Sequence, residues 1–148
     1  MTAFLISSDI YRKTHYGGKH PLNIPRVGPT LDLIKAMYWY SDTSFVNAPI
    51  AKPSLLEKFH SKDYINVLQE VDEKQKIDEY WSKKYNLGTP SNPLFKGMYK
   101  RPATSVGGAV VAAEYAFLYG RAFNLGGGLH HGLANRANGF CYLNDLVF

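Results

Sequence analysis

Three consecutive glycines, Gly126–Gly128, directly follow a short apolar run at 121–125 and lie just before two adjacent histidines, His130 and His131. A short apolar run bounded by polar residues predicts a buried strand. Glycine reaches backbone conformations closed to other residues, so the run favours a tight loop with close backbone approach. Ligands of parallel α/β proteins bind beyond the carboxyl ends of strands. We therefore expect residues 126–145 to form a functional loop.

Short apolar runs alternate with helical segments along the chain, which predicts an α/β fold with a parallel sheet. Strands are expected at 3–8, 44–50 and 121–125, with loops at 9–30 and 88–93. Helices are expected over 30–40, over 54–59 with a Ser54–Glu57 capping box, from Ser61, over 72–85, and from 94 to 119. Small residues at 103–109 predict close packing of the last helix. Asn144 and Asp145 predict a further helix start, so we expect the chain to end within an element.

The 148 residues suffice for one domain, and 45% hydrophobic against 20% charged residues is a normal globular balance. The net charge is +5, but the basic residues are dispersed, which favours solvated lysines over nucleic-acid binding. No segment has the length and apolar character of a membrane span, and the first residues do not resemble a signal peptide. The single cysteine, Cys141, excludes an internal disulfide or a zinc ribbon. These features predict a cytoplasmic protein.

The loop over 126–145 carries residue types suited to acid–base chemistry. The ordinary pKa of histidine lies near neutrality, and adjacent loop histidines rarely arise for packing alone. Gly139 next to Phe140 offers a bare carbonyl beside an aromatic plane, which suits an extended apolar chain ending in an amide. A plain tight turn is the competing interpretation, whereas a phosphate-binding loop is excluded because no Gly-Lys-Ser/Thr follows. Structural roles are expected for four other residues: His15, His20, His60 and Cys141.

The segment GGGLHHGLANRANGFCYLND is similar to the active-site loop of the histone deacetylase family, which includes acetoin utilization proteins and acetylpolyamine amidohydrolases. Further similar segments follow the family order: YGGKHPLNIPR (16–26), KFHSKDYI (58–65), NPLFKGMY (92–99) and SVGGAVVAA (105–113). The acetoin utilization type is the most similar because of GTPSNPLFKGMY. The resemblance implies a three-layer α/β/α arginase-deacetylase sandwich with a parallel sheet. Residues 1–148 would be the N-terminal portion of a single domain of this kind.

The resemblance also implies a reaction. In the family a divalent metal, Zn²⁺ or Fe²⁺, binds a water and the acyl carbonyl. His130 matches the histidine associated with transition-state electrostatics or proton relay. His131 matches the general base on the water, which then acts as the acid toward the leaving amine.

Four further residues match substrate-side positions of the family. Phe140 would form one wall of an acyl-lysine channel, and Gly139 would offer its carbonyl to the substrate amide. Ser91 stands where the family often has an aspartate that grips the substrate backbone, and Arg26 would lie near an internal cavity.

The family's metal ligands lie downstream of this loop, so we expect no metal or other cofactor in this chain. The first hypothesis is therefore an N-terminal fragment of a metal-dependent deacetylase that hydrolyses acetyl-lysine or a related small acyl amide, inactive by itself. The alternative is a natural non-catalytic module for binding or assembly. A sheet cut after three strands would leave an edge unpaired, so we also expect a homo-oligomer, with 146–148 near its interface. No membrane partner is expected.

Overall fold

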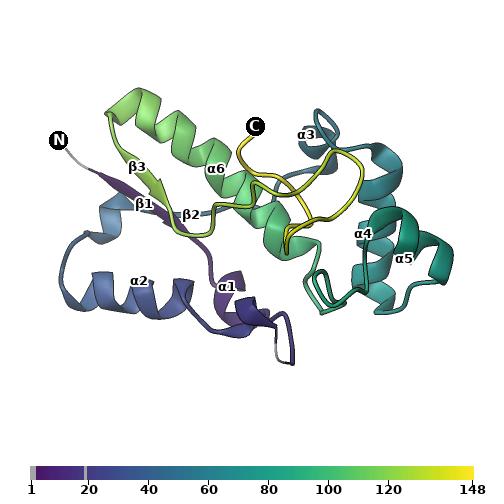
Figure 1. The fold of residues 1–148 in the computed structure, drawn as a ribbon. Helices are drawn as coiled ribbons and strands as arrows, with labels where there is room; N and C mark the ends of the chain where they lie inside the picture. The colour runs from purple at the N-terminus through teal and green to yellow at the C-terminus, as the bar shows by residue number, and fades with distance from the viewer. Residues whose placement is uncertain (1–2, 19) are drawn as a thin grey trace.

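A computed structural model describes residues 3–18 and 20–148; Met1, Thr2 and Lys19 lie outside the described residues. Its centre is a parallel sheet of three strands in the order β2-β1-β3 (Figure 1). The strands are β1 (Phe4–Ser7), β2 (Phe45–Asn47) and β3 (Ala122–Asn124). The central strand β1 pairs with both neighbours, and its residues Leu5 and Ile6 are buried. The predicted α/β class and the three strands are confirmed, although each strand is shorter than its apolar run.

The longest helix, α6 (Lys100–Tyr119), contacts β1 and β3 and lies along the sheet (Figure 1). A side chain at Gly107 would overlap the carbonyl oxygen of Pro49. A Cβ at Gly108 would lie 2.9 Å from Oδ1 of Asn124, the last residue of β3. The close packing predicted from the small residues of this helix is therefore confirmed.

The start of α6 differs from the prediction, because the helix begins at Lys100 and not near residue 94. The side chain of Asp72 is buried, and its carboxylate accepts hydrogen bonds from the backbone N–H groups of Gly97 and Tyr99. Gly97 has φ +98°, which no residue of a right-handed helix adopts. The chain therefore turns just before the helix begins.

The helix predicted from Ser61 is confirmed as α4 (Lys62–Lys74), but the charged helix predicted over 72–85 has other bounds, because residues 72–74 belong to α4 and only α5 (Glu79–Tyr85) follows. That prediction is wrong because Gln75 adopts φ +51° and ends α4. Asp78 then starts a new helix by accepting the backbone N–H of Trp81 at 2.8 Å. Buried side chains of both helices join the core. Its largest fully buried members are Leu56, Tyr64, Ile65, Leu68, Tyr85, Leu87, Met98, Val106, Tyr142 and Leu143.

The remaining helices correct three further predictions. They are α1 (Ile10–Lys13), α2 (Val27–Ala36) and α3 (Pro53–Leu56), with short 3₁₀ turns η1 (Pro21–Asn23) and η2 (Asp42–Ser44). The segment 9–30 is thus no plain loop, and α2 begins before the predicted start because Pro29 fits a first helical turn. Pro53 starts α3 and makes Lys52 its N-cap, so the predicted Ser54–Glu57 capping box is wrong.

The segment that follows β3 runs back toward the helical part of the molecule without forming a helix (Figure 1, yellow). The helix start predicted at Asn144 and Asp145 is therefore wrong. The side-chain amide of Asn144 instead donates to the carbonyl oxygen of Gly132 at 3.0 Å, and the carboxylate of Asp145 binds backbone amides of the glycine run. Among the helices of the described residues, none combines the length and apolar character needed to cross a membrane.

Candidate active site

The glycine-rich loop that carries the tandem histidines begins at the carboxyl end of β3, as predicted. The buried carboxylate of Asp145 holds its backbone by accepting the N–H of Gly128 at 2.8 Å and of Leu129 at 2.6 Å. Asn144 donates to the carbonyl oxygen of His130 at 3.3 Å. Gly128 adopts φ +100°, a conformation that favours glycine. The side chains of Asn144 and Asp145 therefore hold the backbone of residues 128–130 in place.

The two histidine rings lie against each other, and His131 lies against Gly139. Their side chains are exposed, with ring centroids 4.1 Å apart, and Nδ1 of His130 lies 3.1 Å from the carbonyl oxygen of Gly128. A Cβ at Gly139 would approach Cβ of His131 to 2.9 Å, and Gly139 has φ +51°. Glycine is thus required for the close contact. The structure brings together His130, His131 and Gly139.

Phe140 continues this surface, with its backbone in the left-handed region at φ +70°. Its N–H donates to Oδ1 of Asn92 at 3.1 Å, and its carbonyl oxygen accepts the hydroxyl of Tyr16 at 3.0 Å. The imidazole of His20 packs edge-on against the Phe140 ring, with centroids 4.6 Å apart. Nε2 of His20 also lies 3.3 Å from the carbonyl oxygen of Ser91. His20 therefore contacts both Phe140 and the exposed Ser91.

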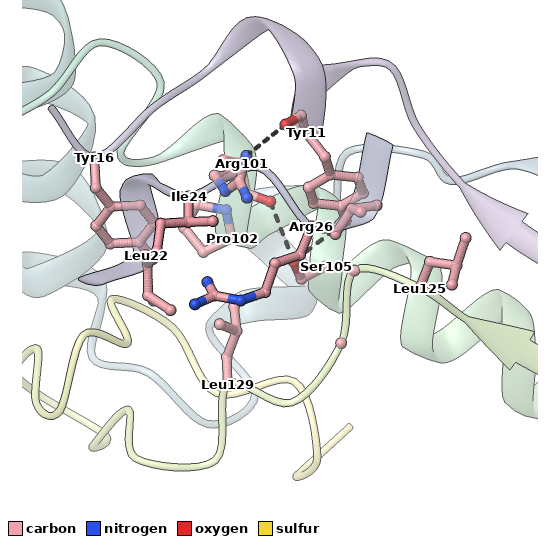
Figure 2. Close-up of a pocket in the computed structure, with 13 residues that line it drawn as sticks. Tyr11, Tyr16, Leu22, Ile24, Arg26, Arg101, Pro102, Ser105, Leu125 and Leu129 are labelled. Atoms are coloured by element: carbon pink, nitrogen blue, oxygen red, sulfur yellow. Dashed lines mark hydrogen bonds between the residues drawn. The ribbon is translucent and has the colours of Figure 1, made fainter. Parts of the chain in front are cut away.

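Arg26 lies apart from these residues and lines a cavity of about 260 Å³ behind the glycine run (Figure 2). Its guanidinium donates to the carbonyl oxygen of Pro21 at 3.4 Å. The other lining residues are Tyr11, Tyr16, Leu22, Ile24, Val27, Arg101, Pro102, Ser105, Leu125, Gly126, Gly127 and Leu129. The lining thus holds two guanidinium groups and no carboxylate, so this cavity is cationic.

Neutral groups hold the second guanidinium of the cavity, that of Arg101. It donates to the carbonyl oxygens of Tyr11 at 3.2 Å and Thr14 at 3.0 Å, and it lies 5.1 Å from the centroid of the Tyr11 ring. Burial lowers the pKa of Arg101 from its ordinary value. Burial also raises the pKa of Tyr16 to about 12, so the Tyr16 hydroxyl keeps its proton at neutral pH.

The donor set near the histidines does not fit a metal centre by itself. Across residues 3–18 and 20–148, no three His, Cys, Asp or Glu side chains are grouped to hold a metal ion. The carboxylate of Asp145 is committed to backbone amides. Cys141 is buried, as predicted, and burial raises the pKa of its thiol. A divalent cation would therefore need ligands beyond these residues.

His60 has the structural role that the sequence predicts. Its buried ring accepts the backbone N–H of Asn144 on Nε2 at 3.0 Å, and Nδ1 lies 3.1 Å from the carbonyl oxygen of Leu133. These partners assign the neutral tautomer with the proton on Nδ1. Burial lowers the pKa of His60. The ring thus joins two parts of the glycine-rich loop, at Leu133 and at Asn144.

Sequence reasoning missed Tyr16, Asn92 and Asp145, and it gave His20 only a structural role. Tyr16, Asn92 and His20 contact Phe140 by a hydrogen bond or a ring contact. Asp145 binds the backbone N–H of Leu129, which directly precedes His130. The available signal was their position inside the segments 16–26, 92–99 and 126–145 that resemble the deacetylase family.

A family described as the histone deacetylase domain matches residues 20–148. The chain belongs to the histone deacetylase family. It is 36% identical over 143 residues to acetoin utilization protein AcuC of Bacillus subtilis (strain 168), across 95% of this chain and 36% of that protein. It is 34% identical over 145 residues to AcuC of Staphylococcus aureus (strain MSSA476), across 96% of this chain and 37% of that protein.

Solved structures of histone deacetylase homologues share the fold. One from Aquifex aeolicus superimposes with a TM-score of 0.93 at 37% identity, covering 99% of this chain and 39% of that chain. An HDAC homologue complexed with SAHA gives a TM-score of 0.92 at 37% identity. The arginase-deacetylase type of α/β fold is therefore confirmed. This chain spans little more than a third of the length of these histone deacetylase relatives.

Proposed function

We propose that this chain supplies the N-terminal part of a single metal-dependent deacetylase domain. The whole protein would hydrolyse the acetyl amide of lysine or a related small acyl amide. One observation carries the proposal: two adjacent imidazoles lie against each other, and His131 lies against Gly139, on one loop of a histone deacetylase family chain.

The tandem histidines are assigned to proton transfer. His131 takes a proton from the attacking water and then gives it to the leaving amine, because imidazole changes charge near neutral pH. His130 supports the developing charge or relays the proton. Their ring separation of 4.1 Å suits such coupling, and Asp145 fixes the backbone just before them.

Residues of the same loop are assigned to substrate binding. Phe140 forms one wall for the apolar stem of the acyl-lysine, and the Gly139 carbonyl accepts the substrate amide N–H. Ser91 lies at the rim and contacts this wall through His20. Arg26 faces the cavity behind the glycine run, where its positive charge favours small anions.

The proposed reaction requires a divalent metal, Zn²⁺ or Fe²⁺, and the described residues do not supply its ligand set. We propose that the ligands belong to the part of the family domain that follows in sequence. The isolated chain should therefore be inactive on acetyl-lysine peptides. Turnover by the isolated chain that disappears in His131→Ala would contradict this.

Two further proposals concern the isolated chain. It should self-associate through the open edge of β3, because several large apolar side chains are exposed there and at the end of α6. They are Phe117, Leu118, Tyr119 and Phe123. A cytoplasmic location agrees with the single free cysteine. The same exposed surface favours the alternative function, a non-catalytic module for assembly.

A chimera tests the proposed enzyme function. Residues 1–148 replace the matching segment of the Aquifex aeolicus homologue, and acetate release from an acetyl-lysine peptide is measured beside the unaltered homologue. We expect the chimera to be active. An inactive chimera that folds and binds metal like its parent would favour the assembly module.

A further inference from the structure

We propose that Tyr16 and Asn92 are positioning residues that hold the Phe140 wall of the site in its left-handed conformation. The role of Phe140 as a wall for the substrate rests on the proposed function. The contacts that hold its backbone do not depend on that function. Neither residue belongs to the glycine-rich loop, and both reach Phe140 from distant parts of the sequence.

The backbone of Phe140 needs such support. Its φ of +70° brings Cβ toward the neighbouring carbonyl oxygen, which is unfavourable for any residue with a side chain. Strained conformations of this kind persist only where the surroundings over-determine them. The preceding Gly139 also has positive φ, so the chain turns sharply here and aims the Phe140 ring.

Both main-chain groups of Phe140 are bound by side chains. Oδ1 of Asn92 accepts its N–H at 3.1 Å, and the hydroxyl of Tyr16 donates to its carbonyl oxygen at 3.0 Å. These partners are 48 and 124 residues away in sequence. The strained residue is therefore held from two sides by parts of the chain that only tertiary folding brings together.

The two holding residues are themselves fixed. Asn92 is fully buried, and its backbone N–H donates to the side chain of Thr89 at 3.1 Å. The ring of Tyr16 is buried and packs against Phe95, with centroids 4.6 Å apart. Burial keeps Tyr16 protonated, because its pKa is raised to about 12. Each therefore offers its polar atom from a rigid position.

The amide of Asn92 acts through its oxygen alone. Within the described residues, Nδ2 of Asn92 is buried and has no hydrogen-bond partner. A flipped amide would direct Nδ2 at the N–H of Phe140 and lose the only side-chain hydrogen bond. The oxygen of Asn92 therefore binds Phe140 while its Nδ2 stays unsatisfied, and aspartate would keep an acceptor oxygen at this position.

His20 completes the support from the side. Its ring stacks on Tyr16 with centroids 4.7 Å apart and planes 13° apart, and it meets Phe140 edge-on. Nδ1 accepts the backbone N–H of Leu22 at 3.1 Å, so Nε2 carries the proton toward Ser91. The Phe140 ring therefore packs against the His20 ring, which Tyr16 and the backbone of Leu22 hold in place.

Amide hydrogen exchange of Phe140, followed by NMR in the 148-residue chain without ligand, tests the proposal. Asn92→Ala should accelerate exchange of the Phe140 amide about tenfold or more, since it removes the acceptor. Asn92→Asp should restore part of this protection, because it keeps an acceptor oxygen in place although it buries a carboxyl group. The matched control, Asn66→Ala on the exposed side of α4, should leave Phe140 exchange unchanged.

Tyr16→Phe provides a variant that keeps the packed ring and removes one oxygen. It should shift the Phe140 resonances and accelerate its exchange, whereas Tyr38→Phe, at an exposed position, should not. Unchanged Phe140 exchange in both Asn92→Ala and Tyr16→Phe would overturn the proposal, as would failure of Asn92→Asp to restore protection. Because no substrate enters the experiment, these results are independent of the chimera assay that tests the proposed function.

Discussion

The carboxylate of Asp145 lies 2.6 Å from the backbone nitrogen of Leu129 and thereby fixes the residue that directly precedes the tandem histidines. The same carboxylate accepts the N–H of Gly128, so each of its two oxygens binds one backbone N–H at the end of the glycine run. Asp145 is buried, which makes each hydrogen bond strong and each lost bond costly. The backbone that leads to the tandem histidines therefore depends on Asp145.

Asp145→Ala should lower the free energy of unfolding by about 2–3 kcal/mol, because it leaves two backbone N–H groups without an acceptor. Urea denaturation followed by circular dichroism measures the change. Asp9→Ala is the matched control, because Asp9 is exposed and its side chain makes no capping hydrogen bond. Equal stability of the two variants would show that Asp145 does not hold the loop.

The stability of the chain should fall as the pH drops below about 6.5, the ordinary pKa of histidine in the unfolded state. The pKa of His60 is lowered in the folded chain, chiefly by burial, so the unfolded chain binds this proton first. The loss should grow until the pH reaches the folded pKa and then level off. His60 protonation would also place an N–H against that of Asn144.

Urea denaturation across this pH range measures the effect. His60→Gln should remove most of the slope that histidine contributes, whereas His15→Gln, at an exposed position, should leave it intact. The interpretation of His60 would be wrong if its replacement left the pH dependence of stability unaltered.

Much of this fold is visible in the sequence because it depends on local patterns. Short apolar runs located β1, β2 and β3, and small residues marked the packed face of α6. The position of the break between α4 and α5 is not visible in the sequence. It depends on the left-handed backbone of Gln75, and the residues around Gln75 are all acceptable in a helix. Local pattern also cannot show that Asp72 binds the backbone before α6.

The candidate site divides in the same way. The tandem histidines and Gly139–Phe140 lie within one segment, so their proximity is visible in the sequence. Tyr16 and Asn92 were missed because their hydrogen bonds to Phe140 span 124 and 48 residues. The sequence predicts a helix start at Asp145 because aspartate binds free backbone N–H groups at the start of a helix. Asp145 binds the N–H groups of the glycine-rich loop in the same way.

The isolated chain should retain no stoichiometric metal. His130 and His131 are exposed, and the other potential ligands of this loop, Asp145 and Cys141, are committed or buried. Elemental analysis after a chelator wash measures bound metal. One tightly held Zn²⁺ or Fe²⁺ per chain would contradict the proposal that the ligands lie elsewhere in the domain.

The isolated chain should also form dimers. Phe117 and Phe123 are 90% and 61% exposed, and burying about 400 Å² of such surface per chain is worth on the order of 10 kcal/mol before association entropy. Phe148 should contribute little to the dimer interface expected near 146–148, because its ring packs near Phe59 and His60 of the same chain. Light scattering should give about twice the chain mass of 16.6 kDa.

Phe117→Lys combined with Phe123→Lys should shift the dimer toward the monomer by introducing charge into the apolar surface. Tyr80→Lys is the control, because Tyr80 is exposed on α5, away from the β3 edge. A concentration-independent monomer in the original chain would rule out this interface.

The most direct test of the account is the rate of acetate release by the chimera that carries residues 1–148 in the Aquifex aeolicus homologue, compared with its His131→Ala variant. General base catalysis contributes about 10²–10⁴-fold, so His131→Ala should reduce the rate by that range. His15→Ala, which replaces an exposed histidine outside the site, should leave the rate within about twofold. An active chimera whose rate is unaffected by His131→Ala would contradict the assignment of this loop as the proton-transfer centre.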